Sequence, residues 1–459
     1  MLTGKATHPL RGRIGGPWAR FVPGALAAFV VACIASCTGG GGGAPAAPTG
    51  VSGDVLLVGG VDQFNGPATV ANLFNPRTGT FVCGPAGFNS KTGVCNSALA
   101  QARFYMSVAP LPNGEVLIAG GNGAGVLCLN SAELFNPLNG TFTPTGSMTD
   151  AHCFAHTTTV LQNGEVLITG GEDQTGNLVN TADMYDPTTG QFECSGLGGA
   201  DPNTGYCLST LTDTRFLDTA TLLQDGSVVI AGGNDGSIVN TAEIFDPVSG
   251  TFGCSSLGGV NPNTGFCNNT MTDSRQNHTA TLIVTGPNAG DVLIAGGLDA
   301  SGVVLQTAEL FNPNTGTFVC SDGSKPGASG CAAAMTSARY LHTATLLAPP
   351  YVKGSMAGDI LIAGGEDGSG TVLSSAEIYD PVAGTFQAVG PMTTSRALAS
   401  AVLITSGPAR GQVLIAGGVD DSGDSLNSAE LFNPSTGKFT ATKGAMTVAR
   451  SSLGAAMVR

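Results

Sequence analysis

Four segments of one repeat decide the fold of this chain: His278-Thr-Ala-Thr-Leu282, Val292-Leu-Ile-Ala-Gly-Gly297, Thr307-Ala-Glu-Leu-Phe-Asn-Pro313 and Thr315-Gly-Thr-Phe318. We interpret them as four short β-strands, A to D, in which B is a continuous apolar run and a Pro- and Gly-containing turn separates C from D. The same order recurs seven times, each copy marked by a double glycine after strand B: Gly59-Gly60, Gly120-Gly121, Gly170-Gly171, Gly232-Gly233, Gly296-Gly297, Gly364-Gly365 and Gly417-Gly418. A period near or somewhat above 50 residues predicts one repeat architecture rather than several unrelated domains.

These repeats resemble the kelch family over roughly residues 55–459. The double glycine and two spaced aromatic residues of that family are present in every copy. Strand C carries Phe74, Phe135, Tyr185, Phe245, Phe311, Tyr379 and Phe432. Strand D, where the family often has Trp, carries Phe81, Phe142, Phe192, Phe252, Phe318, Phe386 and Phe439. The resemblance implies an all-β, seven-bladed β-propeller of four-stranded blades.

The two ends of the repeat region predict how such a ring closes. The region begins with a B strand, Val55–Val58, that has no A strand before it. It ends with Arg450–Val458, an A strand that has no B strand after it. Placing the C-terminal strand in the first blade completes that blade and removes two exposed sheet edges.

The N-terminus has the layout of a secretory signal, with four basic residues before position 21 and an apolar stretch from Phe21 to Ala35. It ends in Ile34-Ala-Ser-Cys37, which resembles the bacterial lipobox and implies cleavage before Cys37 and lipidation of its sulfur. The alternative is an ordinary signal peptide that happens to contain a cysteine. We therefore expect an extracytoplasmic protein anchored in a bacterial membrane, with the outer membrane favoured because Thr38 is not the Asp that tends to retain lipoproteins in the inner membrane. The expected divisions are a signal peptide (1–36), a Gly/Ala/Pro-rich tether (37–50) and the propeller (51–459).

Ten of the 12 cysteines lie beyond the signal, and eight of these occur in pairs between a strand D and the next strand A. Repetition of both cysteines in one slot predicts disulfide-closed inserts in four blades: Cys83 with Cys95, Cys194 with Cys207, Cys254 with Cys267, and Cys320 with Cys331. Cys128 and Cys153 remain, on connections that share a face, and we expect them to pair. Metal binding is the alternative, but no Cys-x-x-Cys spacing occurs, and disulfides agree with an oxidising compartment.

A second repeated position precedes strand A and is basic: Arg103, His152, Arg215, Arg275, Arg339, Arg396 and Arg450. One interpretation pairs these residues with the acidic residue of strand C (Glu133, Asp183, Glu243, Glu309, Glu377 or Glu430), with Asn72 as the exception in blade 1. The alternative is that they contact a ligand, together with the polar residues that open strand A in blades 3 to 6: His156, Asp218, His278 and His342. Packing or hydrogen bonding is favoured over a metal site for the latter, because equivalent positions in different blades are too far apart to share one ion.

Composition narrows the possible functions. Asp and Glu number 32 against 18 Lys and Arg, so the chain carries a net charge of −14 and repels nucleic acid.

Galactose oxidase and related copper-radical enzymes use a kelch propeller, but their site needs a Tyr cross-linked to a free Cys, a second Tyr and two His. Tyr340 and His342 come nearest to that pattern, and every mature cysteine has a partner. A kelch-type sugar isomerase is the other enzymatic alternative.

These considerations favour a monomeric, non-catalytic binding module without a cofactor or metal, recognising a protein or a polysaccharide. Loops such as 366–370 and 420–424 are compatible with calcium, yet turn chemistry explains them equally well.

Overall fold

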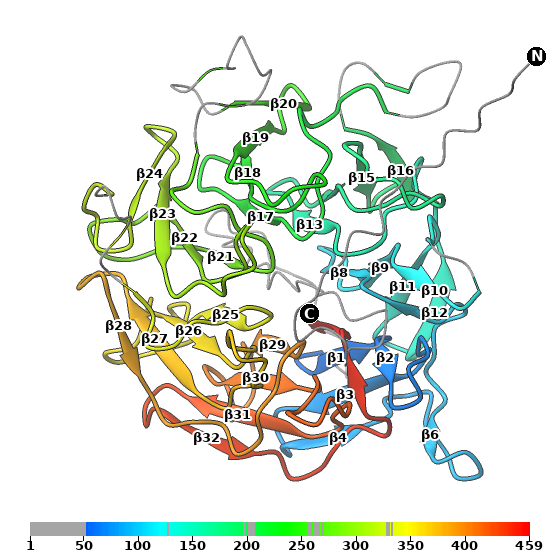
Figure 1. Cartoon of the computed structure of the whole chain (residues 1–459). Helices are drawn as coiled ribbons and strands as arrows, with labels where there is room; N and C mark the ends of the chain where they lie inside the picture. The colour runs from blue at the N-terminus through cyan, green and yellow to red at the C-terminus, as the bar shows by residue number, and fades with distance from the viewer. Residues whose placement is uncertain are drawn as a thin grey trace, which may run out of the picture.

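The computed structural model describes residues 52–125, 128–195, 199–200, 207–254, 259, 267, 270–326, 331 and 334–459. Within these ranges the chain contains strands, turns and loops but no helix, and so no helical segment with the length and hydropathy of a membrane crossing. Seven four-stranded antiparallel sheets stand around a common axis, as predicted (Figure 1). The structure confirms a seven-bladed β-propeller.

Each blade runs from an inner strand A to an outer strand D. Blade 1 contains β34 (Gly454–Met457), β1 (Val55–Val58), β3 (Ala71–Asn75) and β4 (Thr80–Val82). Blade 2 contains β8 (Ser107–Pro110), β9 (Val116–Ala119), β11 (Ala132–Asn136) and β12 (Thr141–Pro144). Blade 3 contains β13 (Thr157–Val160), β14 (Val166–Thr169), β15 (Ala182–Asp186) and β16 (Gln191–Cys194). Blade 4 contains β17 (Thr219–Leu222), β18 (Val228–Ala231), β19 (Ala242–Asp246) and β20 (Thr251–Gly253).

Blade 5 contains β21 (Thr279–Leu282), β22 (Val292–Ala295), β23 (Ala308–Asn312) and β24 (Thr317–Cys320). Blade 6 contains β25 (Thr343–Leu346), β26 (Ile360–Ala363), β27 (Ala376–Asp380) and β28 (Thr385–Ala388). Blade 7 contains β29 (Ser400–Leu403), β30 (Val413–Ala416), β31 (Ala429–Asn433) and β32 (Lys438–Ala441). Three two-stranded ribbons lie in the connections: β2 (Val61–Asp62) with β33 (Arg450–Ser451), β7 (Arg103–Phe104) with β10 (Asn122–Gly123), and β5 (Phe88–Asn89) with β6 (Val94–Cys95).

The core lies between neighbouring blades. Every residue of the seven B strands is buried, because each B strand is covered on both faces by an adjacent sheet. The aromatic residue of strand C packs on the Phe of strand D in each blade, with ring centroids 4.9–5.3 Å apart. The two repeated aromatic positions are therefore one packing contact per blade, and tilted rings at this separation are a favourable arrangement.

The double glycine marks the point where two blades touch. In blade 5, Gly296 and Gly297 have φ of +64° and +98°, a region in which residues with a side chain are strained. A Cβ on Gly296 would lie 2.4 Å from the carbonyl oxygen of Arg339 in blade 6. The N–H of Gly297 donates to the same oxygen at 2.9 Å. Glycine is required here both for the backbone conformation and for this close approach.

The C-terminal strand closes the ring as predicted. β34 pairs antiparallel with β1, with Val55 opposite Met457 and Val58 opposite Gly454. Beyond the paired residues, the N–H of Gly53 donates to the carbonyl of Val458 at 2.7 Å. β34 also lies beside the inner strands β8 and β29 of the two adjacent blades. The C-terminal end of the chain is thus an internal part of blade 1.

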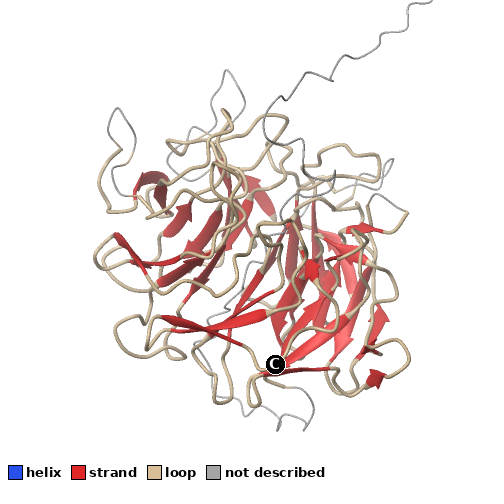
Figure 2. Cartoon of the chain, turned by 60° about the horizontal axis from the view of Figure 1, so that its bottom comes forward, coloured by secondary structure: helices blue, strands red, loops and turns tan. Residues whose placement is uncertain are grey.

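Alternating strand directions define two faces. The A–B and C–D connections share one face, which we call the A–B face; the B–C connections and the crossings into the next strand A share the other, the B–C face. The described part of the chain begins and ends on the A–B face, where Gly53 lies beside the A–B loop of blade 7 and Arg459 beside the A–B loop of blade 2. Figure 2 shows the C-terminus at one end of the sheets.

Candidate functional site

The repeated arginines form a buried layer just before each strand A. All six side chains are at most 1% exposed. Arg275 is representative: one guanidinium nitrogen donates to the carbonyl of Gly296 at 2.9 Å, and the other lies 2.8 Å from Oε1 of Glu309. The corresponding Arg–Glu distances are 3.1 Å for Arg103–Glu133, 2.6 Å for Arg215–Glu243, 3.1 Å for Arg339–Glu377 and 3.1 Å for Arg396–Glu430.

Blades 1 and 3 keep the contact between the basic position and strand C, but with residues other than Arg and Glu. In blade 3, Nε2 of His152 lies 3.2 Å from Oδ2 of Asp183, and Nδ1 lies 2.7 Å from the carbonyl oxygen of Gly170. Burial opposes protonation of His152, but the hydrogen bond and charge of Asp183 outweigh it and raise its pKa. In blade 1, Arg450 donates to Oδ1 of Asn72 at 2.9 Å. Burial lowers the pKa of Arg450 to about 9, because an amide does not offset the lost hydration as a carboxylate does.

These contacts confirm the pairing of the basic position with strand C. Each pair ties the crossing from the previous blade to the B and C strands of the blade that follows. Ligand contact by the same residues is not tested by this geometry and stays a prediction.

A ring of left-handed residues lies between each arginine position and strand A. Seven residues have φ between +49° and +58°: Tyr105, Ala155, Leu217, Asn277, Leu341, Leu398 and Ser452. Most of them donate their N–H to the carbonyl of the equivalent residue in the preceding blade, at 3.1–3.3 Å: Leu217 to Ala155, Asn277 to Leu217, Leu341 to Asn277, Leu398 to Leu341 and Ser452 to Leu398. The blades are thus linked around the axis by consecutive backbone hydrogen bonds.

Side chains of this ring close the axis near the B–C face. Ala155, Leu217 and Leu398 form one buried cluster, against which Leu341 and Val419 pack. These residues come from blades on opposite sides of the ring, so their side chains meet across the axis. We did not predict this cluster from the sequence, because its members share a backbone conformation but no common side-chain chemistry.

The histidines that open strand A lie at the predicted end of the strand but are buried, at most 5% exposed. Each contacts the hydroxyl of the preceding blade: His156 with Ser107 at 2.5 Å, His278 with Thr219 at 3.0 Å and His342 with Thr279 at 3.0 Å. Burial lowers the pKa of His156 and of His278 to about 3, which keeps both rings neutral. The hydrogen-bonding role expected for these histidines is confirmed.

Asp218 takes the same slot in blade 4 and is 1% exposed. Among the described residues, no other residue donates a hydrogen bond to either of its carboxylate oxygens. Burial raises the pKa of Asp218 to about 7, an effect that nearby Arg215 partly offsets. A carboxylate therefore stands where blades 3, 5 and 6 have a neutral imidazole.

Tyr340 and His342 do not converge on one point. The Tyr340 hydroxyl donates to Oε1 of Glu366 at 2.8 Å, whereas His342 contacts Thr279 of blade 5. Within the described residues, no group of three His, Cys, Asp or Glu side chains is arranged to hold a metal ion.

Five disulfides join the cysteines in the predicted pairs, with Cα–Cα distances of 4.9–5.3 Å. Four of them close the inserts that follow strand D: Cys83 with Cys95 in blade 1, Cys194 with Cys207 in blade 3, Cys254 with Cys267 in blade 4, and Cys320 with Cys331 in blade 5. The fifth joins Cys128 to Cys153 and links the B–C connection of blade 2 to the crossing into blade 3.

The second cysteine of an insert brings the chain back toward the blade. Cys267 is 3% exposed although most of the chain between it and Cys254 lies outside the described residues. Cys331 is half-buried, and its partner Cys320 is fully buried. Cys194 and Cys320 end their D strands directly opposite Asp183 and Glu309, the partners of the buried basic layer. The base of each of these two inserts therefore lies beside the buried basic layer.

Blade 1 has the most completely described insert, where β5 and β6 form a short hairpin that holds Phe88 56% exposed. Cys37, most of the interior of the inserts of blades 3 and 4, and residues 327–330 of the blade 5 insert lie outside the described residues. The ring thus carries four disulfide-closed inserts after strand D, and the insert of blade 1 exposes an aromatic side chain.

A comparison with protein families matches the Kelch motif at residues 153–195 and 350–393. The first match covers blade 3 from the crossing to the end of β16, and the second runs from the A–B loop of blade 6 through β28. A search of curated proteins found no significant match.

Proposed function

Since this chain is a kelch-repeat β-propeller, we propose that it is an extracytoplasmic, lipid-anchored binding module that recognises a protein or a polysaccharide without catalysing a reaction. Such a fold does not by itself define a function, so the proposal depends on the surface features of this chain. One observation carries it: disulfide-closed inserts occupy the same slot in blades 1, 3, 4 and 5.

The inserts are well suited to recognition because they are constrained before a partner arrives. Loops held by a rigid scaffold are where binding usually resides, and prior ordering lowers the entropy lost on association. Each small disulfide loop contributes about 3 kcal/mol in the chain-entropy model. The disulfides constrain loops that lie outside the four-stranded sheets. The sheets themselves contain no residue from the interior of the inserts.

We expect the anchor to depend on Cys37. Cys37→Ser removes the sulfur that would carry the diacylglycerol, so the protein should lose palmitate labelling and move from the membrane fraction to the soluble fraction. Cys33→Ser, which changes a cysteine within the signal, should leave both properties unchanged. A Cys37→Ser protein that still partitions into detergent would refute the lipid anchor.

We expect partner recognition to depend on the inserts of blades 3 and 4. A variant in which the segment between Cys194 and Cys207 and the segment between Cys254 and Cys267 are each replaced by a short Gly-containing turn should fold like the parent chain, because both segments begin after strand D has ended. It should lose binding by at least about tenfold to whatever partner a glycan array and a panel of extracytoplasmic proteins identify with the parent chain. Thermal melting of both proteins establishes that folding is preserved.

A matched variant carries Cys194→Ser and Cys207→Ser, which opens one insert without removing it. It should bind more weakly than the parent chain because the insert must now be ordered on binding. Undiminished binding by the insert-replacement variant would place recognition elsewhere on the propeller.

A further inference from the structure

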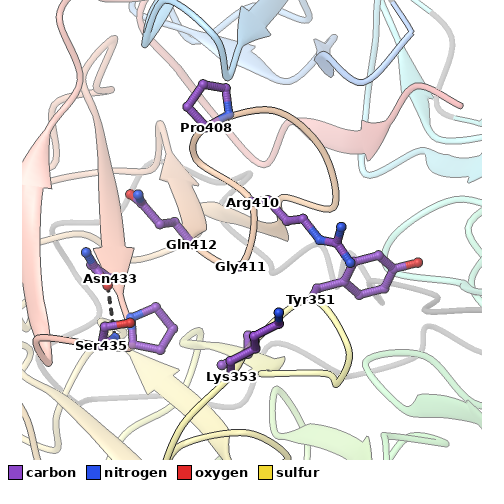
Figure 3. Close-up of a pocket in the computed structure, with 10 residues that line it drawn as sticks. Tyr351, Lys353, Pro408, Arg410, Gly411, Gln412, Asn433 and Ser435 are labelled. Carbon is purple, nitrogen blue, oxygen red and sulfur yellow. Dashed lines mark hydrogen bonds between the residues drawn. The ribbon is translucent and has the colours of Figure 1, made fainter.

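A cavity lies on the A–B face, away from the inserts. The A–B connections of blades 2 to 4 are short, spanning 111–115, 161–165 and 223–227. Those of blades 5 to 7 are extended, spanning 283–291, 347–359 and 404–412. The extended loops of blades 6 and 7, together with the C–D turn of blade 7, line an open cavity of about 430 Å³ (Figure 3). Small-molecule sites commonly measure about 300–1,000 Å³, so this volume suits one or two sugar rings rather than a long polymer segment.

The cavity wall is built from hydrogen-bonded backbone. The N–H of Val352 donates to the carbonyl of Ala348 at 3.0 Å, and the N–H of Gly411 donates to the carbonyl of Ile404 at 2.8 Å. The two loops also touch directly, since a Cβ on Gly411 would lie 2.6 Å from the carbonyl oxygen of Tyr351. The shape of the cavity is therefore set by the fold and does not require a ligand to order it.

Two cations face the cavity. Lys353 comes from the loop of blade 6 and Arg410 from the loop of blade 7, both are exposed, and the Arg410 guanidinium carbon lies 5.2 Å from the centroid of the Tyr351 ring (Figure 3). A cation over an aromatic ring at this distance is attracted to it, which orients the guanidinium. Among the described residues, the cavity lining contains no carboxylate, and neither cation has an ion-pair partner.

Neutral polar groups complete the lining. Gln412 and Asn433 are half-buried, and the backbone N–H of Ser435 donates to Oδ1 of Asn433 at 2.9 Å. That bond fixes the Asn433 amide, and Figure 3 shows its nitrogen on the side away from Ser435. Pro408 and Pro434 add apolar surface. Amides, a hydroxyl and small apolar faces are the groups that bind sugar hydroxyls and the C–H faces of sugar rings.

Two unpaired cations in one cavity stand out in a chain of net charge −14. Surface charges more than about 8 Å away are largely screened at physiological ionic strength, so the local charges decide what enters the cavity. A planar guanidinium matches a carboxylate through two parallel hydrogen bonds, and an ammonium adds a second, point-like contact. The local field therefore favours an oxyanion despite the acidity of the whole protein.

We propose that this cavity binds the carboxylate-bearing residue of an acidic glycan, with Arg410 and Lys353 on the carboxylate and Gln412, Asn433 and Ser435 on the ring hydroxyls. An anionic membrane surface is the less favoured ligand, because the amide groups are recessed in a concave site that a flat lipid surface does not fill. The site uses no residue of the inserts and lies on the opposite face, so it does not depend on the function proposed above.

The proposal is tested by calorimetric titration of the full chain with trigalacturonate and with its methyl ester, which is neutral but otherwise matched. We expect binding of trigalacturonate that weakens as salt is raised, and at least about tenfold weaker binding of the ester. Equal affinity for both would overturn the assignment of a carboxylate site. This comparison needs no variant, so it does not depend on the folding of any substitution.

Variants then locate the site. Arg410→Gln and Lys353→Gln should each weaken trigalacturonate binding by at least about tenfold. Lys443→Gln, which removes an exposed cation outside the cavity, should not. Unchanged binding by both cavity variants would overturn the location. The variant lacking the inserts of blades 3 and 4 should bind trigalacturonate normally, which separates this site from the function proposed for the inserts.

Two further titrations distinguish other anions. Inorganic phosphate should bind more weakly than trigalacturonate, since it makes no contact with the amides. Vesicles containing phosphatidylglycerol should show no binding that depends on Arg410. Binding of phosphate or of vesicles, with none of trigalacturonate, would overturn the glycan assignment.

Discussion

Deletion of residues 451–459 should abolish the single cooperative unfolding transition of this protein. The deletion removes β34, the inner strand of blade 1, and with it the buried side chains of Leu453 and Val458. Burial of each is worth about 1.5–3 kcal/mol, and the backbone hydrogen bonds to β1 add about 0.5–1.5 kcal/mol each. The sum, on the order of 5–10 kcal/mol, is comparable with the total stability of a typical domain, about 5–15 kcal/mol.

The effect should extend beyond blade 1. Without β34, strand β1 has an exposed edge, and the inner strands β8 and β29 each lose the neighbour that links them. Because the blades bury their cores only against one another, an open ring exposes two blade faces at once. We therefore expect early, broad unfolding by circular dichroism and rapid proteolysis, rather than a frayed end.

A one-residue truncation provides the control. Removing only Arg459, which is exposed, should leave the melting temperature unchanged. Melting of the longer deletion at the temperature of the parent chain would show that β34 is not required for closure.

Loss of a single carboxylate from the buried layer should be the second largest effect. Glu309→Ala leaves the buried Arg275 guanidinium with only the partly exposed Asp273 as an ion-pair partner, at 3.5 Å, and removing one side of a buried ion pair commonly costs about 3–5 kcal/mol. The backbone N–H of Thr272, which donates to the same carboxylate at 2.8 Å, also loses its acceptor. Urea denaturation should show this as a lower midpoint with an unchanged slope.

Blade 1 indicates how the loss can be reduced. Because Arg450 is held there by an amide, Glu309→Gln should destabilise the protein less than Glu309→Ala. The double variant Arg275→Met with Glu309→Leu should recover much of the loss, since it removes both charges. Glu193→Ala, which removes an exposed glutamate from strand D of blade 3, should have little effect. Equal effects of the Glu309 and Glu193 substitutions would mean that the buried pair does not stabilise the fold.

The repeated pattern was sufficient to predict much of this molecule. Strand order, ring closure by residues 450–458, the five cysteine pairs and the partners of the arginine layer all follow from comparing seven copies with one another. Each of these features lies within one blade or joins one blade to the next, where every copy repeats the same register. The replacement of Arg by His152 opposite Asp183 is informative for the same reason, because a change on one strand is accompanied by a change on its partner.

Other features depend on how the copies meet, and only the tertiary structure decides them. The left-handed ring includes Tyr105, Leu217 and Asn277, residue types with no common preference, because the conformation is imposed by hydrogen bonds from blade to blade. The apolar cluster across the axis joins blades that are far apart in sequence. The hydrogen-bond partner of each histidine lies in the preceding blade. The pKa of Asp218 is raised to about 7 because its carboxyl group is buried between blades.

The cavity on the A–B face is another feature that only the tertiary structure decides. The sequence by itself showed that the A–B loops lengthen in blades 5 to 7, but loop length does not determine which side chains converge. Lys353 and Arg410 come from different blades and face one cavity because the loops of blades 6 and 7 pack together. The repeat thus determined the scaffold, since its contacts recur with the period of the chain. The proposed anion site does not recur from blade to blade. It is formed once, where two irregular loops pack together.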